Sequence, residues 1–171
     1  LYPFIINKLL LLSLQYGTTP ETPYLLTEYG LLNILQGNIQ EGYRVGEIAV
    51  ELLNTLSGYE SMKVRVLALL YLYIFHWKQH YKNASVQWLE IYQRAINAGD
   101  LEYAAYALTS FSMLQRSIGT ELSVAEEKSY TFQNTIEQSL NQPVAKMAIE
   151  IFLEFISNLR KNTANQISWQ E

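Results

Sequence analysis

The sequence predicts an all-α fold of about eight helices stacked as antiparallel hairpins, and three observations lead to this prediction. Apolar residues recur at steps of three and four positions along the chain, and no stretch alternates as a strand would. Signals that stop one helix and start the next recur about every twenty residues. The connections between them are short, so sequential helices should be antiparallel neighbours.

The first two helices are predicted from glycine and proline signals. A helix over residues 3–16 should end at Gly17, and Pro20 in a first turn should begin a second helix that ends at Gly37. Asn7 and Lys8 interrupt the apolar run near the start, which is shorter than the ~18 residues that a membrane span needs. We therefore expect an amphipathic core helix here, and neither a signal sequence nor a span.

The third helix, over residues 39–56, carries the pattern around which the chain is organised. Gly37 suits the left-handed residue after a helix, Asn38 suits an N-cap, and Glu41 would complete a capping box with it. Each glycine inside a helix costs about 1 kcal/mol relative to alanine, so we attribute these glycines to the close approach of a neighbouring helix. The small residues of this packing face are Gly42, Gly46 and Ala49.

The fourth helix, predicted over residues 60–80, is apolar on all sides and should therefore be the most buried element. The fifth, over 84–98, should end at Gly99. Asp100 should cap the sixth helix, which runs to residue 118 and repeats the small-residue pattern at Ala104 and Ala105.

The seventh and eighth helices are predicted over residues 121–140 and 143–161, which makes residues 1–161 a single helical-repeat domain. Residues 162–171 should be a loosely ordered tail. The period of about forty residues per hairpin is typical of tetratricopeptide-like (TPR-like) solenoids, so we expect a right-handed stack with a concave and a convex face.

Thirteen tyrosines are many for this length. Packing in the core and between repeats is the simplest explanation of them. The alternative is that some line a groove that receives a peptide, because aromatic residues are enriched at interfaces. The candidates for such a groove are Tyr24, Tyr29, Tyr71, Tyr73 and Tyr106.

Composition excludes several classes of protein. The formal net charge is −4, and the twelve Lys and Arg residues are scattered, which argues against a nucleic-acid partner. The chain has no cysteine, so it has neither disulfides nor thiolate metal sites. The absence of cysteine fits a reducing compartment, and we expect the protein to be cytoplasmic.

Catalytic chemistry finds no support in the residue patterns. His76 and His80 have a spacing that can bind a metal on one helical face, but no third ligand accompanies them. The carboxylate pairs Glu126/Glu127 and Glu150/Glu154 fit solvated helix faces. No glycine-rich phosphate loop is present either. We therefore predict no catalytic, cofactor-binding or metal-binding residue, and no enzyme activity for this chain.

Several segments carry a resemblance to a known family. They read LQYG (14–17) with PE (20–21), YG (29–30), GNIQEGYRVGEIAVELL (37–53), HWK (76–78) and GDLEYAAYA (99–107). In this order they resemble the helical-repeat region of large bacterial, notably cyanobacterial, multi-domain signalling kinases. The resemblance covers residues 14–107, and Asn38 stands where the family has aspartate.

The resemblance implies a segment that lies between a serine/threonine kinase with an AAA-type ATPase module on one side and GAF and histidine kinase modules on the other. The shared residues are packing and capping residues, so no active-site role is transferred. The chain begins at Leu1 and its methionines lie inside the sequence, so we expect a segment of a longer protein.

We therefore expect an interaction and signal-relay module whose partner is a protein or peptide, most simply a neighbouring domain of the same chain. A free-standing peptide-binding protein is the first alternative. A small metal-dependent enzyme that uses His76 and His80 is the second.

Overall fold

The computed structural model describes the backbone of residues 1–167 and the side chains of residues 1–161. This part of the chain contains eight α-helices and no strand, so the all-α prediction is confirmed. The helices are α1 (Tyr2–Tyr16), α2 (Thr22–Leu35), α3 (Ile39–Thr55), α4 (Glu60–Leu69), α5 (Tyr81–Ala98), α6 (Leu101–Ser117), α7 (Leu122–Thr135) and α8 (Pro143–Ile167).

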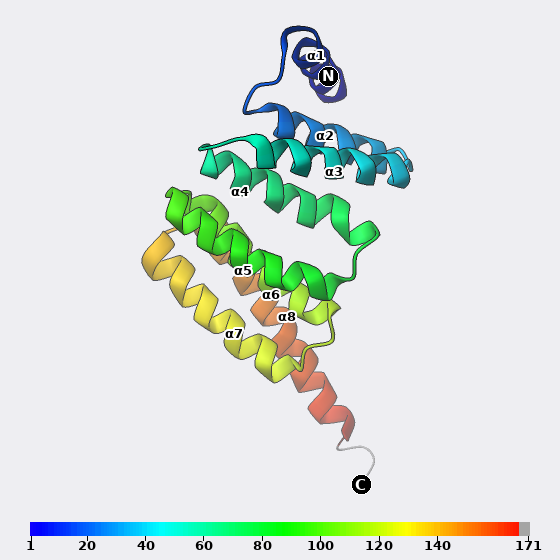
Figure 1. Cartoon of the computed structure of the whole chain (residues 1–171). Helices are drawn as coiled ribbons and strands as arrows, with labels where there is room; N and C mark the ends of the chain where they lie inside the picture. The colour runs from blue at the N-terminus through cyan, green and yellow to red at the C-terminus, as the bar shows by residue number, and fades with distance from the viewer. Residues whose placement is uncertain (168–171) are drawn as a thin grey trace.

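The helices pack as adjacent antiparallel pairs, most extensively α2 with α3 and α5 with α6, while α4 lies between these two pairs. Figure 1 shows them stacked one after another from α1 to α7 and α8, so the two termini lie at opposite ends of the molecule. The order follows from the short connections, because a turn of a few residues places the next helix beside the previous one.

Two main hydrophobic cores hold the stack together, and a third, smaller cluster of Ala125, Phe152 and Ile156 joins α7 to α8. The larger core joins α4, α5, α6 and α8, around Trp88, Leu108 and Ile149. The smaller core joins α2, α3 and the end of α4, around Ile34 and Leu70. The side chains of Leu67 and Tyr71 pack against both cores, so α4 connects the two halves of the molecule.

Glycines allow α2 and α3 to approach each other closely. A Cβ on Gly42 would lie 2.6 Å from the backbone oxygen of Gly30 and 2.5 Å from Cγ1 of Ile34. A Cβ on Gly46 would lie 3.0 Å from Cγ2 of Ile74 and 3.2 Å from Cδ2 of Leu70. The small-residue face of α3 therefore lies in the helix contact, and Gly30 of α2 is a partner that the sequence analysis did not single out.

The predicted continuous helix over residues 60–80 is wrong. The α-helix ends at Leu69 and continues as a π-helical turn, η1 (Leu70–Ile74), and then a 3₁₀ turn, η2 (Phe75–Trp77). The wider π turn changes the direction in which side chains project, so Leu72, Tyr73 and Trp77 are each more than 40% exposed. A similar π turn, η3 (Ile136–Leu140), follows α7.

The helix caps agree with the sequence at one glycine motif and differ at the other. Asp100 caps α6, accepting a hydrogen bond from the backbone N–H of Tyr103 at 3.3 Å. Asn38 occupies the N-cap position of α3, but its side chain makes no capping hydrogen bond. Glu41 pairs with Arg44 instead of closing a capping box, so that prediction is wrong. Both Gly37 and Gly99 have positive φ, as predicted.

The C-terminal helix is longer than predicted, since α8 continues to Ile167 through part of the expected tail. The rest of that tail, residues 168–171, lies outside the described residues. None of the described helices is long and apolar enough to cross a membrane.

Candidate functional site

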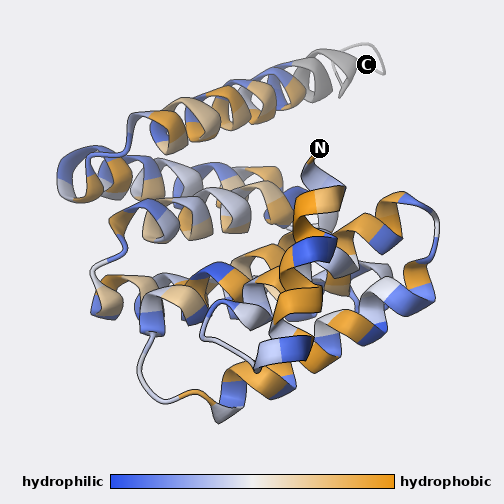
Figure 2. Ribbon diagram, turned by 90° about the horizontal axis from the view of Figure 1, so that it is seen from above, coloured by the Kyte–Doolittle hydropathy of each residue, from blue (hydrophilic) through white to orange (hydrophobic). Residues whose placement is uncertain are grey.

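The first helix is attached to the stack differently from the others. It packs mainly against α2, and Ile6 is its only buried residue. Figure 2, which looks down on the α1 end of the stack, shows α1 lying across α2 and α3 with apolar residues on its outer surface. Phe4, Leu11 and Leu14 are 71%, 61% and 83% exposed. The expected core helix is thus only partly buried.

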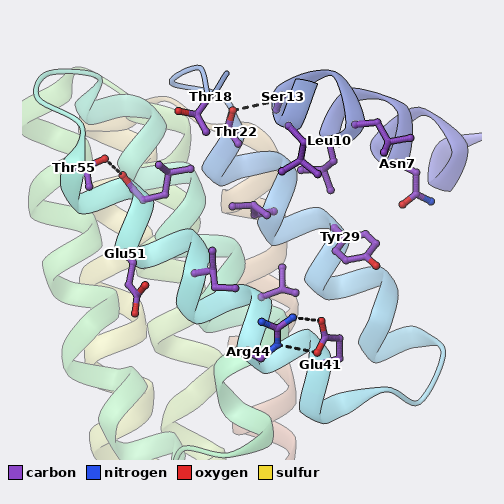
Figure 3. Close-up of a pocket in the computed structure, with 16 residues that line it drawn as sticks. Asn7, Leu10, Ser13, Thr18, Thr22, Tyr29, Glu41, Arg44, Glu51 and Thr55 are labelled. Atoms are coloured by element: carbon purple, nitrogen blue, oxygen red, sulfur yellow. Dashed lines mark hydrogen bonds and ion pairs between the residues drawn. The ribbon is translucent and has the colours of Figure 1, made fainter. Parts of the chain in front are cut away.

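A groove of about 900 Å³ lies between α1, α2 and α3. Figure 3 shows its walls, with Asn7 and Leu10 projecting from α1 toward α2 and α3. The groove is lined by Asn7, Leu10, Leu11, Ser13, Leu14, Thr18, Thr22, Leu26, Tyr29, Glu41, Arg44, Val45, Ile48, Glu51, Leu52 and Thr55.

One face of α3 forms a wall of the groove along most of the helix. The lining positions Arg44, Ile48, Glu51 and Thr55 are spaced by three and four residues, so they lie on one side of an α-helix. They lie about half a turn around α3 from Gly42 and Gly46, which pack against α2 and η1. The glycine face therefore holds α3 in the stack and leaves the opposite face available.

Most polar groups of the groove already have partners. Arg44 donates to both carboxylate oxygens of Glu41, at 2.6 and 2.9 Å, and these hydrogen bonds hold the pKa of Glu41 below its ordinary value. The hydroxyl of Thr22 accepts from the backbone N–H of Thr19 at 2.8 Å, and that of Thr55 donates to the carbonyl of Leu52 at 2.7 Å.

Four polar side chains of the groove make no hydrogen bond. Asn7, Thr18, Tyr29 and Glu51 have no side-chain hydrogen bond or ion pair with any other residue that the structure describes. Figure 3 shows the Glu51 side chain directed away from the Glu41–Arg44 pair. The groove thus combines apolar walls, one neutralised ion pair and one unpaired carboxylate.

A hydrogen bond fastens the start of α1 over α2. The hydroxyl of Tyr2 donates to the carboxylate of Glu28, which is 7% exposed. Burial and the neighbouring Glu28 raise the pKa of Tyr2, and the same two causes raise the pKa of Tyr24 to about 12. Both hydroxyls therefore stay protonated near neutral pH.

We expect Tyr2→Phe to loosen α1 without unfolding the stack. The substitution removes one hydrogen bond to a carboxylate, a contribution of about 1.5–3 kcal/mol, so backbone amides of α1 should exchange with solvent deuterium roughly ten- to a hundredfold faster. Tyr16→Phe is the control, since Tyr16 is 76% exposed. Equal exchange in the two variants would show that Tyr2 does not hold α1.

The five candidate tyrosines lie in different parts of the structure. Of these five, Tyr29 lines the groove. Tyr71 packs edge-on against Phe75 with ring centres 5.3 Å apart. Tyr106 donates to Glu102 at 3.0 Å. Tyr24 packs against the smaller core, and Tyr73 of η1 is 41% exposed.

Sequence reasoning missed the leucines of α1 and the outer face of α3. The exposure of the α1 leucines had a signal in the sequence. Apolar residues occur on all sides of the first helix and do not form a single stripe, so some of them must face away from a core.

His76 and His80 do not share a helical face, because the α-helix has ended before them. The ring of His76 stacks on Tyr81 with centres 5.7 Å apart, and burial lowers the pKa of His76. His80 caps α5, where its Nδ1 accepts a hydrogen bond from the backbone N–H of Lys82 at 3.1 Å. Within the described residues, no group of three or more His, Cys, Asp or Glu side chains could hold a metal.

One carboxylate of each predicted pair has a structural partner. Glu126 forms an ion pair with Arg160, and Glu150 accepts a hydrogen bond from Gln133 at 3.1 Å. The groove is therefore the feature of the described chain that is best suited to a ligand. Comparison of the chain with protein families, with curated proteins and with solved structures found no match.

Proposed function

We propose that this chain is a non-catalytic protein-interaction module, and that its groove receives an apolar segment of a partner protein. The observation that carries the proposal is the space between α1, α2 and α3, with exposed leucines on one wall and Ile48 and Leu52 on the other. Covering such side chains removes apolar surface from water, at about 25 cal/mol per Å², which supplies the driving force for binding.

The shape of the groove favours a protein segment over a small metabolite. Lining residues follow α3 from Glu41 to Thr55 and the lining surface is mostly apolar, whereas sites for small polar molecules place several hydrogen-bonding groups around one point. The four polar side chains without a hydrogen-bond partner are spread over α1, α2, α3 and the connection after α1, and are too scattered for that.

The proposal includes the wider setting that the sequence resemblance implies. In it the helices are TPR-like repeats of a right-handed solenoid that joins the modules of a signalling kinase, and the groove holds a segment of a neighbouring domain. A stack of helices can bend slightly at each interface, so occupation of the groove would be transmitted along it.

Ile48→Asp should abolish binding to the groove. Three synthetic amphipathic peptides of about 14 residues, with leucines at helical spacing and polar positions filled by Lys, Gln or Glu, serve as probes in fluorescence anisotropy. At least one should bind, and Ile48→Asp should weaken it more than tenfold, because an unpaired carboxylate would be buried against the peptide.

Ile151→Asp provides the matched control, since Ile151 is an exposed isoleucine of α8, 61% accessible, outside the groove. Binding should survive in this variant. If none of the three peptides binds, or if both variants lose binding equally, the groove is not an interaction site.

A further inference from the structure

We infer that the groove selects a basic amphipathic α-helix of about four turns, with a cationic side chain placed against Glu51. This inference rests on the proposed function and specifies the partner. It combines three observations on the lining residues: their hydrogen-bonding state, their extent along α3 and their charge.

The hydrogen-bonding state of the groove favours a helical ligand over an extended one. An extended peptide carries backbone N–H and C=O groups that need partners when they are buried. The hydroxyls of Thr22 and Thr55 and the Glu41–Arg44 pair are already engaged, and the side chains without partners are spread over three helices and a connection, so they do not form a row that could pair with an extended backbone. A helix satisfies its own backbone groups and presents only side chains, so an apolar groove can accept it without that cost.

The extent of the α3 wall sets the length of the ligand. The lining positions run from Glu41 to Thr55, and at 1.5 Å per residue their span is about 20 Å. A ligand helix of about 14 residues covers this distance. Its apolar side chains at three- and four-residue spacing would contact Leu11 and Leu14 on one wall and Ile48 and Leu52 on the other.

The charge of the groove determines whether a positive or a negative side chain is favoured on the ligand. Arg44 is paired with Glu41, so neither attracts a further charge strongly. Glu51 has no ion pair with another described residue, whereas the exposed Glu47, one turn before it, is not among the residues that line the groove. The remaining charge at the groove is therefore negative, as is the formal net charge of the chain, −4. A cation on the ligand would be attracted and an anion repelled.

Peptide comparison tests the inference in two parts. The Lys-containing peptide should bind about two- to fivefold more tightly than the Gln-containing one, because one partly exposed ion pair contributes an affinity gain of this size. The Glu-containing peptide should bind least tightly. A fourth peptide, with the Lys sequence but two central prolines, cannot form a helix and should lose binding.

Glu51→Gln should remove the preference for the Lys-containing peptide, and Glu47→Gln should keep it. The two variants change the net charge equally, so a difference between them identifies the groove carboxylate and not the overall charge. Equal binding of the Lys, Gln and Glu peptides, or equal effects of the two variants, would overturn the basic preference. Binding of the proline-containing peptide would overturn the helical ligand.

These outcomes remain distinct from a failure of the proposed function. If the three helical peptides bind equally and Ile48→Asp abolishes their binding, the groove is an interaction site and only its selectivity has been misassigned. If no peptide binds, both proposals are wrong.

Discussion

Gly42→Ala is expected to lower the free energy of unfolding by about 2–3 kcal/mol, even though alanine favours helix formation over glycine by about 1 kcal/mol. The new Cβ would lie 2.6 Å from the backbone oxygen of Gly30 and 2.5 Å from Cγ1 of Ile34. A side chain can rotate away from such a contact, whereas a backbone oxygen can move only with its helix. Accommodation of the methyl group therefore requires α2 and α3 to separate. Urea denaturation followed by circular dichroism measures the change.

Gly46→Ala is the matched control on the same face of α3. Its Cβ would meet side-chain atoms and no backbone, Cγ2 of Ile74 at 3.0 Å and Cδ2 of Leu70 at 3.2 Å, so the neighbours need to give by only a few tenths of an ångström. Its destabilisation should be clearly smaller than that of Gly42→Ala. If Gly42→Ala proved the more stable of the two, close backbone approach would not be the reason for glycine at position 42.

Asp100→Ala is expected to destabilise the fold by about 3 kcal/mol. The carboxylate is 8% exposed, caps α6 through the backbone N–H of Tyr103, and accepts hydrogen bonds from Ser61 at 2.6 Å and from Arg65 at 3.1 Å. It thus joins the start of α6 to α4. A lost cap costs about 0.5–2 kcal/mol, and a lost hydrogen bond to a charged group about 1.5–3 kcal/mol.

The contribution of Asp100 should depend on pH. Burial alone raises the pKa of this carboxyl, but the hydrogen bonds from Ser61, Tyr103 and Arg65 outweigh burial and hold the pKa below its ordinary value of 3.8. Because the folded pKa is the lower one, the stabilisation is fully present above the unfolded pKa and is lost as the pH falls through the folded pKa.

Asp100→Asn should therefore destabilise the protein near pH 7 and reduce the dependence of its stability on pH below about 4. Urea denaturation at several pH values between about 3 and 7 measures both effects. Glu41, whose pKa is also lowered, is retained in the wild type and in the variant, so it does not contribute to the difference. Parallel stability curves for the two proteins would show that Asp100 is not the group that titrates.

The sequence predicted helix boundaries well where local signals determine them. Pro143 begins α8, Asp100 caps α6, and Gly37 and Gly99 follow helices with positive φ. Each of these depends on the conformational preference of one residue and its immediate neighbours. At Asn38 and Glu41 the pattern was right for a capping box, but Arg44 one turn away competed successfully for the carboxylate.

The long apolar helix was mispredicted because periodicity cannot distinguish α from π turns. Residues 60–80 contain no proline or glycine, so nothing local marks the end at Leu69. The packing of Leu70, Ile74 and Phe75 into the smaller core decides the local geometry there, and that contact is made with α2 and α3.

The groove could not be predicted because it depends on how α1 lies across α2 and α3. Pattern reasoning assigns the leucines of the first helix to a core, and only the arrangement in space leaves Leu11 and Leu14 exposed. The Tyr2–Glu28 hydrogen bond, which fastens α1, joins residues 26 positions apart and leaves no local trace in the sequence.

The presence of two cores connected through α4 has a mechanical consequence. The termini lie at opposite ends of the stack, so tension between them passes through the stretch around Leu67 and Tyr71, where α4 gives way to the π turn. Val64 and Ala68 of α4 belong to the larger core, and Val66 of the same helix belongs to the smaller one. A pull that displaces α4 should therefore loosen both halves together.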